Sequence, residues 1–365
     1  MRQLRRVVLR LLLITTMLAT GIAAVATGAA AAVPDRWGFA LVDVTSGIPS
    51  PSHQAGSWPG GFNVTVSPGG TGEVFVKFPM IGAAGVDNSV VHVTAISELA
   101  QWCQAEKWWT AGTDEIVAVR CYLYGGTPQF SRFSIVIEDS SGGLPAPQAL
   151  GYVYWNGGAT AASFNSAGAP NTVVPTVTGV WTVTLNGVGS TVQEGGFQVT
   201  AVDSGVPARC KLSAWSWTAS AQKVQVRCFD ATNVPLNTGW TLTYQRQRAI
   251  TGAAIPPKYF AYTYDNMPAA LGPYTPVPAG VTFNSVGSFN EIQSAGPGLR
   301  LVTFHKVGVL PDHVQVTAFG PGPQFCNLLT TWATSGMEVL VRDVACYNAT
   351  TRANNASMIS YTSAL

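Results

Sequence analysis

After its first 35 residues the chain repeats itself three times. Residues 91–95 (VHVTA) recur as residues 197–201 (FQVTA) and 314–318 (VQVTA), at offsets of 106 and 117 positions. A pair of cysteines follows each of these segments in the same order. A unit of about a hundred residues that keeps its landmarks in order is one structural module present in three copies.

Large residues recur at similar distances from these cysteines. One set stands twelve residues after the second cysteine of each copy: Phe133, Trp240 and Met358. The other set lies five or six residues after the first cysteine: Trp109, Trp215 and Trp332. Recurrence of aromatic residues in every copy, as at Trp109, Trp215 and Trp332, predicts that these side chains pack in the core.

Short segments alternate between apolar and polar residues. Residues 73–78 (EVFVKF) and 223–228 (KVQVRC) have this period of two, which predicts strands with one buried face. The chain also has 38 glycines and 23 prolines, which suit many tight turns. The predicted fold class is therefore all-β, with three tandem β-sandwich-like repeats of six or seven strands. The alternative is one threefold assembly in which the copies share a sheet or a core.

Two segments with loop composition separate the copies. Residues 140–148 read SSGGLPAPQ, and residues 247–257 end in two prolines. Neither segment alternates as a strand does. We expect repeats at residues 36–139, 149–246 and 258–365, and the proline-rich connections favour separate sandwiches.

The six cysteines form three pairs, one in each repeat. The pairs are Cys103 with Cys121, Cys210 with Cys228, and Cys326 with Cys346, separated by 18, 18 and 20 residues. A strand, a polar turn and a second strand lie between partners, so antiparallel pairing brings the two cysteines within disulfide reach. We expect one disulfide inside each repeat and none between repeats. No histidine or cysteine supplies the other ligands of a zinc site at matching positions, so no metal site is predicted.

The N-terminus has the composition of a secretory signal. Arg2, Arg5, Arg6 and Arg10 precede an apolar stretch over residues 11–25, and small residues end at Ala32. This pattern predicts a signal peptide over residues 1–32, export by the general or the twin-arginine route, and an extracellular mature protein. The apolar stretch is short and rich in alanine, and no membrane span is expected in the mature chain.

Removal of the signal changes the charge of the protein. The whole chain has 20 Lys+Arg and 18 Asp+Glu, and loss of the four signal arginines leaves 16 against 18, a net charge of −2. Nucleic-acid-binding proteins present an excess of basic residues. The mature chain is therefore not expected to bind nucleic acid.

Catalytic motifs are missing from the sequence. No Gly-x-Ser-x-Gly, His-Glu-x-x-His or phosphate-binding loop occurs. His92 and His305 stand where the other copies have Gln or Pro and Asn, which predicts exposed, neutral positions. Asp312 and His313 are adjacent, so on a strand they would point to opposite faces. The prediction is a protein that is not an enzyme and holds no cofactor, with a secreted hydrolase using two of the 18 carboxylates as a weaker alternative.

Tryptophans that do not recur are the candidate binding residues. They are Trp155, Trp217, Trp108, Trp102 and Trp58. Trp155 corresponds to Val42 in the first copy and to Asp265 in the third, and a position that accepts an aspartate is expected at the surface. An exposed indole can stack on the C–H groups of a sugar ring.

The chain resembles a group of secreted actinobacterial proteins built from tandem β repeats. The resemblance is carried by an opening strand at residues 151–155 (GYVYW), a strand at 199–201 (VTA) and a strand at 224–228 (VQVRC). The resemblance implies export and this architecture, and it implies no activity. The third copy departs from the pattern at residues 341–346 (VRDVAC), where an insertion is expected to disturb the strand register.

The leading functional hypothesis is a secreted, non-catalytic binding protein for extracellular polysaccharide or a cell-wall surface. Three linked modules would bind with avidity even if each bound weakly. The alternative is a protein-binding or structural extracellular protein, such as an inhibitor, an adhesin or a coat component. An inhibitor would present a stiff exposed loop, for which residues 245–257 are the nearest candidate.

Overall fold

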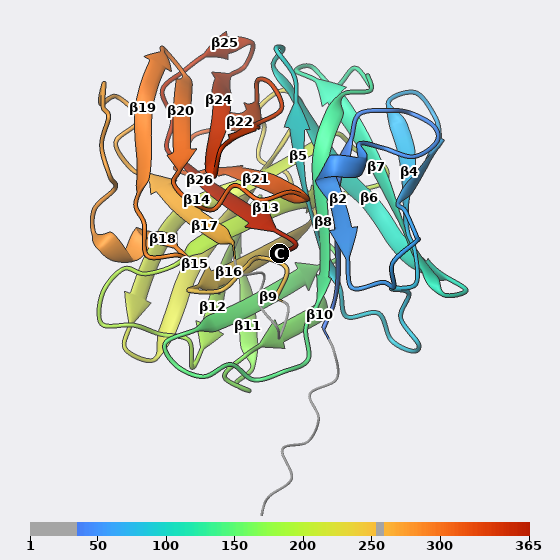
Figure 1. Ribbon diagram of the computed structural model, residues 1–365, viewed down its shortest axis with the longest axis horizontal. Coiled ribbons are helices and arrows are strands. Elements are labelled where there is room, and N and C mark those ends of the chain that lie inside the picture. Colours follow the sequence, from blue (N-terminus) through green and yellow to red (C-terminus); the bar gives the residue numbers. More distant parts are fainter. Residues whose placement is uncertain (1–34, 253–258) are drawn as a thin grey trace, which may run out of the picture. The chain divides into compact units, whose positions relative to one another are not determined.

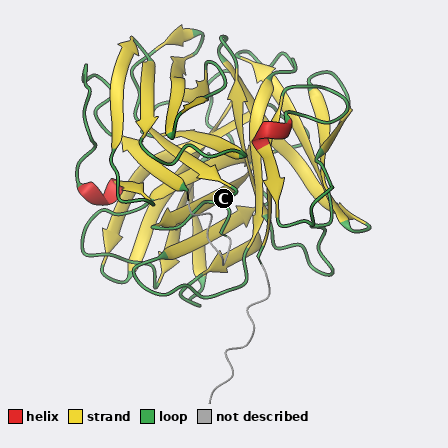
Figure 2. Ribbon diagram, in the orientation of Figure 1, coloured by secondary structure: helices red, strands yellow, loops and turns green. Residues whose placement is uncertain are grey.

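Strands make up nearly all of the regular structure in the computed structural model, which describes residues 35–252 and 259–365 (Figures 1 and 2). The predicted signal peptide and the end of the second connection lie outside the described residues. The first repeat, copy 1, contains β1 (Arg36–Val42), β2 (Gln54–Gly56), β3 (Thr65–Pro68), β4 (Glu73–Phe78), β5 (Val90–Ile96), β6 (Gln101–Ala111), β7 (Asp114–Leu123) and β8 (Arg132–Asp139).

The second and third repeats follow the same order of strands. Copy 2 contains β9 (Ala149–Trp155), β10 (Thr160–Asn165), β11 (Asn171–Val177), β12 (Val180–Asn186), β13 (Gly196–Val202), β14 (Ala208–Thr218), β15 (Ala221–Asp230) and β16 (Gly239–Arg246). Copy 3 contains β17 (Phe260–Asp265), β18 (Thr282–Asn284), β19 (Asn290–Gly296), β20 (Leu299–Phe304), β21 (Asp312–Ala318), β22 (Phe325–Leu328), β23 (Ala333–Ser335), β24 (Glu338–Asn348), β25 (Thr351–Arg352) and β26 (Ser357–Ser363). The two helical elements of the described residues are single 3₁₀ turns, η1 (Pro51–His53) and η2 (Ala279–Val281).

Each copy is a sandwich of two four-stranded antiparallel sheets, to which copy 3 adds two short strands. The first sheet of copy 1 has the order β2-β1-β8-β5, and the second has the order β3-β4-β7-β6. The same orders recur in copies 2 and 3, so the all-β sandwich prediction is confirmed. The described copies have eight to ten strands where six or seven were expected, because short edge strands such as β2 and β3 lack a long alternating pattern.

The second sheets have one covered face and one open face. Along β4, Val74, Val76 and Phe78 are buried and alternate with half-buried Glu73, Phe75 and Lys77. By contrast, β5, β13 and β21 are buried along their whole length. Both faces of these three strands are covered, because one packs inside its own copy and the other meets the other copies near the middle of Figure 1.

The copies share sheets. The first sheet of copy 2 continues into the second sheet of copy 1 through parallel β13 and β6 at Val202 and Ala105. The first sheet of copy 1 joins the second sheet of copy 3 through parallel β5 and β22. A single parallel bridge between Leu212 and Phe319 closes the third junction. The strand pairing therefore agrees with the alternative prediction, a threefold assembly whose copies share sheets, and not with separate sandwiches.

A ring of three equivalent threonines links the copies. Thr200 Oγ1 accepts the backbone N–H of Val93 in copy 1 at 3.0 Å. Thr317 Oγ1 accepts the N–H of Val199, and Thr94 Oγ1 accepts the N–H of Val316, each at 2.9 Å. Each copy thus caps a buried donor of another copy, and such donors are costly to leave unpaired.

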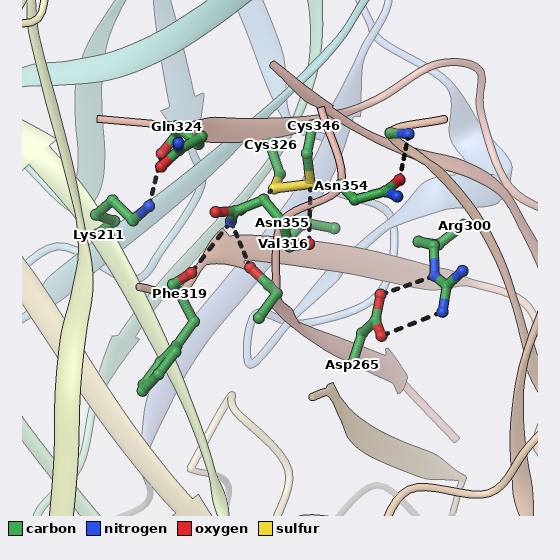
Figure 3. The surroundings of a disulfide bond; sticks show 12 residues. Lys211, Asp265, Arg300, Val316, Phe319, Gln324, Cys326, Cys346, Asn354 and Asn355 are labelled. Atoms are coloured by element: carbon green, nitrogen blue, oxygen red, sulfur yellow. Dashed lines mark hydrogen bonds and ion pairs between the residues drawn. A yellow bond between two sulfur atoms is a disulfide. The ribbon is translucent and has the colours of Figure 1, made fainter. Parts of the chain in front are cut away.

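A second ring uses the residue after the first cysteine of each copy. Gln104 Nε2 donates to the carbonyls of Asp203 and Val206 in copy 2 at 2.6 and 2.9 Å. Lys211 Nζ donates to the carbonyls of Gly322 and Gln324 in copy 3 at 3.1 and 2.9 Å (Figure 3). Completing the cycle, the Asn327 side chain donates to the carbonyls of Leu99 and Gln101 in copy 1.

The three predicted disulfides are confirmed. Cys103 pairs with Cys121, Cys210 with Cys228, and Cys326 with Cys346. In each copy the two cysteines are directly opposite one another on paired antiparallel strands. The third pair lies beside Asn355, whose side chain donates to the Phe319 carbonyl (Figure 3).

The insertion in the third copy produces an irregular register: Arg300 pairs with Val344, whereas Val302 pairs with Val341.

The candidate inhibitor loop is largely covered over its described part, since residues 248–252 are all buried. A buried segment cannot enter the site of another protein, so the described part of this loop does not support an inhibitor.

Candidate functional site

The structure distributes the five candidate tryptophans over separate places. Trp217 is exposed, at 38% of its surface, whereas Trp58 and Trp108 are half-buried. The described residues contain no ring contact between any two of the five. They therefore do not form one aromatic binding surface.

Trp155, expected at the surface, is buried with 9% of its surface exposed. Its ring stacks on that of Trp240, with centroids 6.4 Å apart. The inference from Asp265 was wrong because this aspartate is itself fully buried, in an ion pair with Arg300 (Figure 3).

Trp102, the second corrected position, is buried where the three copies meet. The guanidinium carbon of Arg209 lies 4.7 Å from its ring centroid and 4.6 Å from that of Phe325. These three residues precede the first cysteine of their copies, so they are equivalent. Stacking on Arg209 between the copies explains why this indole is covered.

Trp109 is the aromatic residue that sequence reasoning placed wrongly in the core. A register shift between Ala105 and Lys107 in β6 puts Trp108 opposite Val117 and Trp109 opposite Ile116. Trp215 is opposite Val224, and both valines lie four residues before the second cysteine. Trp108 is therefore the equivalent of buried Trp215, and Trp109 points to the open face of the second sheet. The spacing of five residues from Cys103 to Trp108 could have identified this match.

A groove of about 580 Å³ lies over the open face of the second sheet of copy 1. It is lined by Thr65, Ser67, Phe75, Lys77, Lys107, Trp109 and Ile116. The rings of Phe75 and Trp109 meet nearly at right angles with centroids 6.1 Å apart. Lys107 Nζ lies 5.5 Å from the Trp109 ring centroid. A concave site with apolar walls and a few polar groups is the usual form of a ligand-binding site.

The fold does not require the aromatic residues of this groove. In copy 2, Thr182 and Ser216 occupy the positions of Phe75 and Trp109, because they pair with residues at the same distance before the second cysteine. In copy 3 the position of Trp109 is taken by Ala333. Small residues at these positions still allow the same strands to form.

Carboxylates occur in the next row of the same face. Arg120 lies 3.2 Å from Glu73 and 2.9 Å from Glu106. Burial raises the pKa of Glu106 to about 7, and a hydrogen bond to Glu73 acts in the same direction. Glycosidases hold their two carboxylates about 5–10 Å apart to admit a sugar or a water. Two carboxylates that are hydrogen-bonded to each other and ion-paired with one arginine form a structural cluster and lack that space.

The histidines differ from the sequence expectation. His92, expected to be exposed, has only 1% of its surface accessible, and Nε2 lies 2.8 Å from Thr243 Oγ1 in copy 2. His313 and Asp312 do point apart: His313 stacks on Phe39, whereas buried Asp312 lies 2.6 Å from His53 Nδ1 of copy 1 and also accepts hydrogen bonds from Trp332 and Thr334. Within the described part of the chain, no serine, threonine or cysteine side chain is hydrogen-bonded to the His53 ring, so this pair lacks a nucleophile.

Two other hollows lie where copies meet. A cavity of about 50 Å³ between the copies has room for a few water molecules. A mostly apolar hollow of about 390 Å³ lies between copies 1 and 3 beside Tyr124, Tyr347 and Arg352. Residues 35–252 and 259–365 contain no cluster of three or more potential metal ligands, and no helix among them is both long and apolar enough to cross a bilayer.

No family model, curated protein or solved structure matches this chain.

Proposed function

We propose that this is an exported, non-catalytic protein that binds extracellular polysaccharide through the groove of copy 1. The observation that carries the proposal is the pair of Trp109 and Phe75 on an open sheet face, at positions where the fold accepts Ser216 and Thr182. Indole faces stack on sugar C–H groups. A groove suits a polysaccharide chain better than a flat apolar patch would.

Export is supported by the basic and apolar N-terminal segment together with three disulfides, which persist in oxidising compartments. The mature protein is expected to begin near Val33 and to accumulate in the culture medium. N-terminal sequencing of the secreted product checks this. A cell-retained product that still begins at Met1 would contradict export.

The binding test uses the mature protein and two tryptophan variants. Wild type, Trp109→Ala and Trp217→Ala are incubated with chitin, cellulose and peptidoglycan, and the retained fraction is measured. Loss of the groove indole should weaken binding about two- to tenfold, the effect of one aromatic contact. Trp217 is the matched control, because it is an exposed tryptophan outside the groove.

Melting curves of all three proteins accompany the binding measurement, so that loss of folding is not mistaken for loss of a contact. Equal retention of wild type and Trp109→Ala would remove the groove from the proposal. If wild type binds none of the three glycans, and none of the acidic and neutral polysaccharides tested below, the glycan proposal is rejected in favour of a protein partner or a structural role.

A further inference from the structure

We propose that the groove of copy 1 selects polysaccharides built from uronic acids over neutral ones. The inference rests on the proposed glycan binding and adds the chemical class of the ligand. Its basis is that both charged residues lining the groove, Lys77 and Lys107, are cations. A uronic acid offers a pyranose ring with an apolar C–H face and a single carboxylate on the same unit, which matches an aromatic ring beside a lysine.

The strand register sets the layout of the groove. β4 supplies Phe75 and Lys77, β6 supplies Lys107 and Trp109, and β7 runs between them with Ile116 as the floor. Phe75 is level with Lys107, and Lys77 is level with Trp109, so each aromatic residue faces a lysine across β7. A sugar ring on either aromatic side chain would therefore have an ammonium group beside it.

The two ammonium groups are placed differently. Lys77 Nζ is 3.2 Å from Asp114 Oδ2, and 45% of the Lys77 side chain remains exposed. Lys107 is exposed, and its ammonium lies over the Trp109 ring. An anion bound at Trp109 would meet Lys107 directly, and Lys77 would add a second contact beside its existing ion pair.

The acidic residues of the same face do not cancel this preference. Glu73 and Glu106 do not line the groove, and both are directed at Arg120. One guanidinium matches one of the two carboxylates, and because the pKa of Glu106 is raised to about 7, part of the second negative charge is absent at neutral pH. Lys77 is already paired with Asp114, so Lys107 is the cation of the groove that can match one negative charge per sugar unit, whereas a highly sulfated chain would need more cations.

Copy 2 provides an internal comparison. The positions of Phe75, Lys77, Lys107 and Trp109 carry Thr182, Thr184, Ala214 and Ser216. Copy 2 therefore has neither aromatic residues nor lysines at these four positions. Its exposed Lys223 lies on the corresponding face without aromatic neighbours there, so it serves as a control for general charge effects.

The experiment measures the affinity of the mature protein for polygalacturonate, alginate, neutral dextran and dextran sulfate by affinity electrophoresis. Polygalacturonate and alginate are expected to bind more tightly than dextran, and to weaken as salt rises. Lys107→Gln should reduce affinity for polygalacturonate about three- to tenfold, as loss of one charge-assisted contact would. The same substitution should leave any dextran binding unchanged, and Lys223→Gln should change neither.

Each remaining result has a distinct meaning. Equal affinity for dextran and polygalacturonate, both dependent on Trp109, would overturn the acidic preference and keep glycan binding. Equal losses in Lys107→Gln and Lys223→Gln, or tighter binding of dextran sulfate that survives Trp109→Ala, would show unspecific charge attraction and overturn the proposed site. Binding to none of the four polymers would count against the proposed function itself.

Discussion

Burial of His92 between copies 1 and 2 couples the stability of the fold to pH. Burial lowers the pKa of this imidazole to about 3, against 6.5 for an exposed histidine. The folded protein therefore binds this proton only in strong acid, whereas the unfolded chain binds it below about pH 6.5. The stabilising effect is complete above pH 6.5 and is lost as the pH falls toward 3. His313 is buried to the same extent and acts in the same direction.

Replacement of His92 by glutamine should make the protein less sensitive to acid. Gln198 and Gln315 occupy the equivalent positions, so the site accepts an amide in this fold. Between about pH 5.5 and 3.5 the free energy of unfolding of His92→Gln should fall less steeply than that of wild type, by about 1.4 kcal/mol per pH unit. Urea unfolding across this range measures the difference. Parallel pH profiles of the two proteins would contradict the assigned burial.

Truncation of two tryptophans should lower the free energy of unfolding to very different extents. Trp155→Ala removes a buried indole that stacks on Trp240, and should cost about 3–5 kcal/mol of the free energy of unfolding. Trp109→Ala removes a half-buried side chain with one aromatic contact, to Phe75, and should cost about 0.5–1.5 kcal/mol. Melting and urea curves compare the two variants. A larger loss in Trp109→Ala than in Trp155→Ala would reverse the assignment of core and surface.

At the scale of strands, the sequence located the elements well and their facing residues less well. The strand segments, the hairpins and all three disulfides could be predicted, because alternation and spacing are local signals. The errors are shifts of one residue: Trp109 was matched to Trp215 in place of Trp108, and Met358 was matched to Phe133 although Ser357 holds that position in β26. A bulge or a shortened loop changes the spacing by one, and in a strand one residue reverses the face.

The wrong placement of Trp155 has a different cause: the residues at two core positions, one on each of two strands, differ together from copy to copy. Trp155 on β9 and Trp181 on β12 are both buried in the core of copy 2. The equivalent positions are Val42 and Val74 in copy 1, and the ion pair of Asp265 and Arg300 in copy 3 (Figure 3). Asp265 indicated a surface position only because its ion-pair partner, Arg300, could not be recognised from the sequence.

This exchange of pairs predicts the behaviour of the ion pair in copy 3. Arg300→Met leaves Asp265 buried without its cation and should cost about 3–5 kcal/mol. The double variant Asp265→Val with Arg300→Val introduces the pair found in copy 1 and should recover part of that loss. Recovery is partial because Arg300 also donates to the carbonyls of Ala270 and Met267. Urea midpoints measure both variants, and a double variant less stable than the single one would contradict the equivalence.

Across the whole described region, the side-chain hydrogen bonds between copies include two cyclic sets, and apolar clusters cross the same junctions. The threonine ring and the ring of Gln104, Lys211 and Asn327 each run once around the three copies. The equivalent segments are recognisable in the sequence but the closure is not, because most of the bonds join a side chain of one copy to the backbone of another. Such bonds leave no apolar or alternating pattern. The proline-rich connections indicated boundaries that the shared sheets cross.

Unfolding should therefore be a single cooperative transition of the three copies. Sheets that pass from copy to copy, and buried donors capped by another copy, would be exposed if one copy opened alone. Scanning calorimetry of the mature protein with its disulfides intact should give one peak, with a van't Hoff enthalpy close to the calorimetric enthalpy.

Thr200→Val provides the sharper form of this test. It leaves the N–H of Val93 in copy 1 without its acceptor and should cost about 1–3 kcal/mol. Because the copies are coupled, the whole peak should move to lower temperature without splitting. Thr263→Val is the matched control, since its buried hydroxyl has no hydrogen-bond partner among the described residues and its replacement should be nearly neutral. Three peaks, of which only one moves in Thr200→Val, would establish independent modules instead.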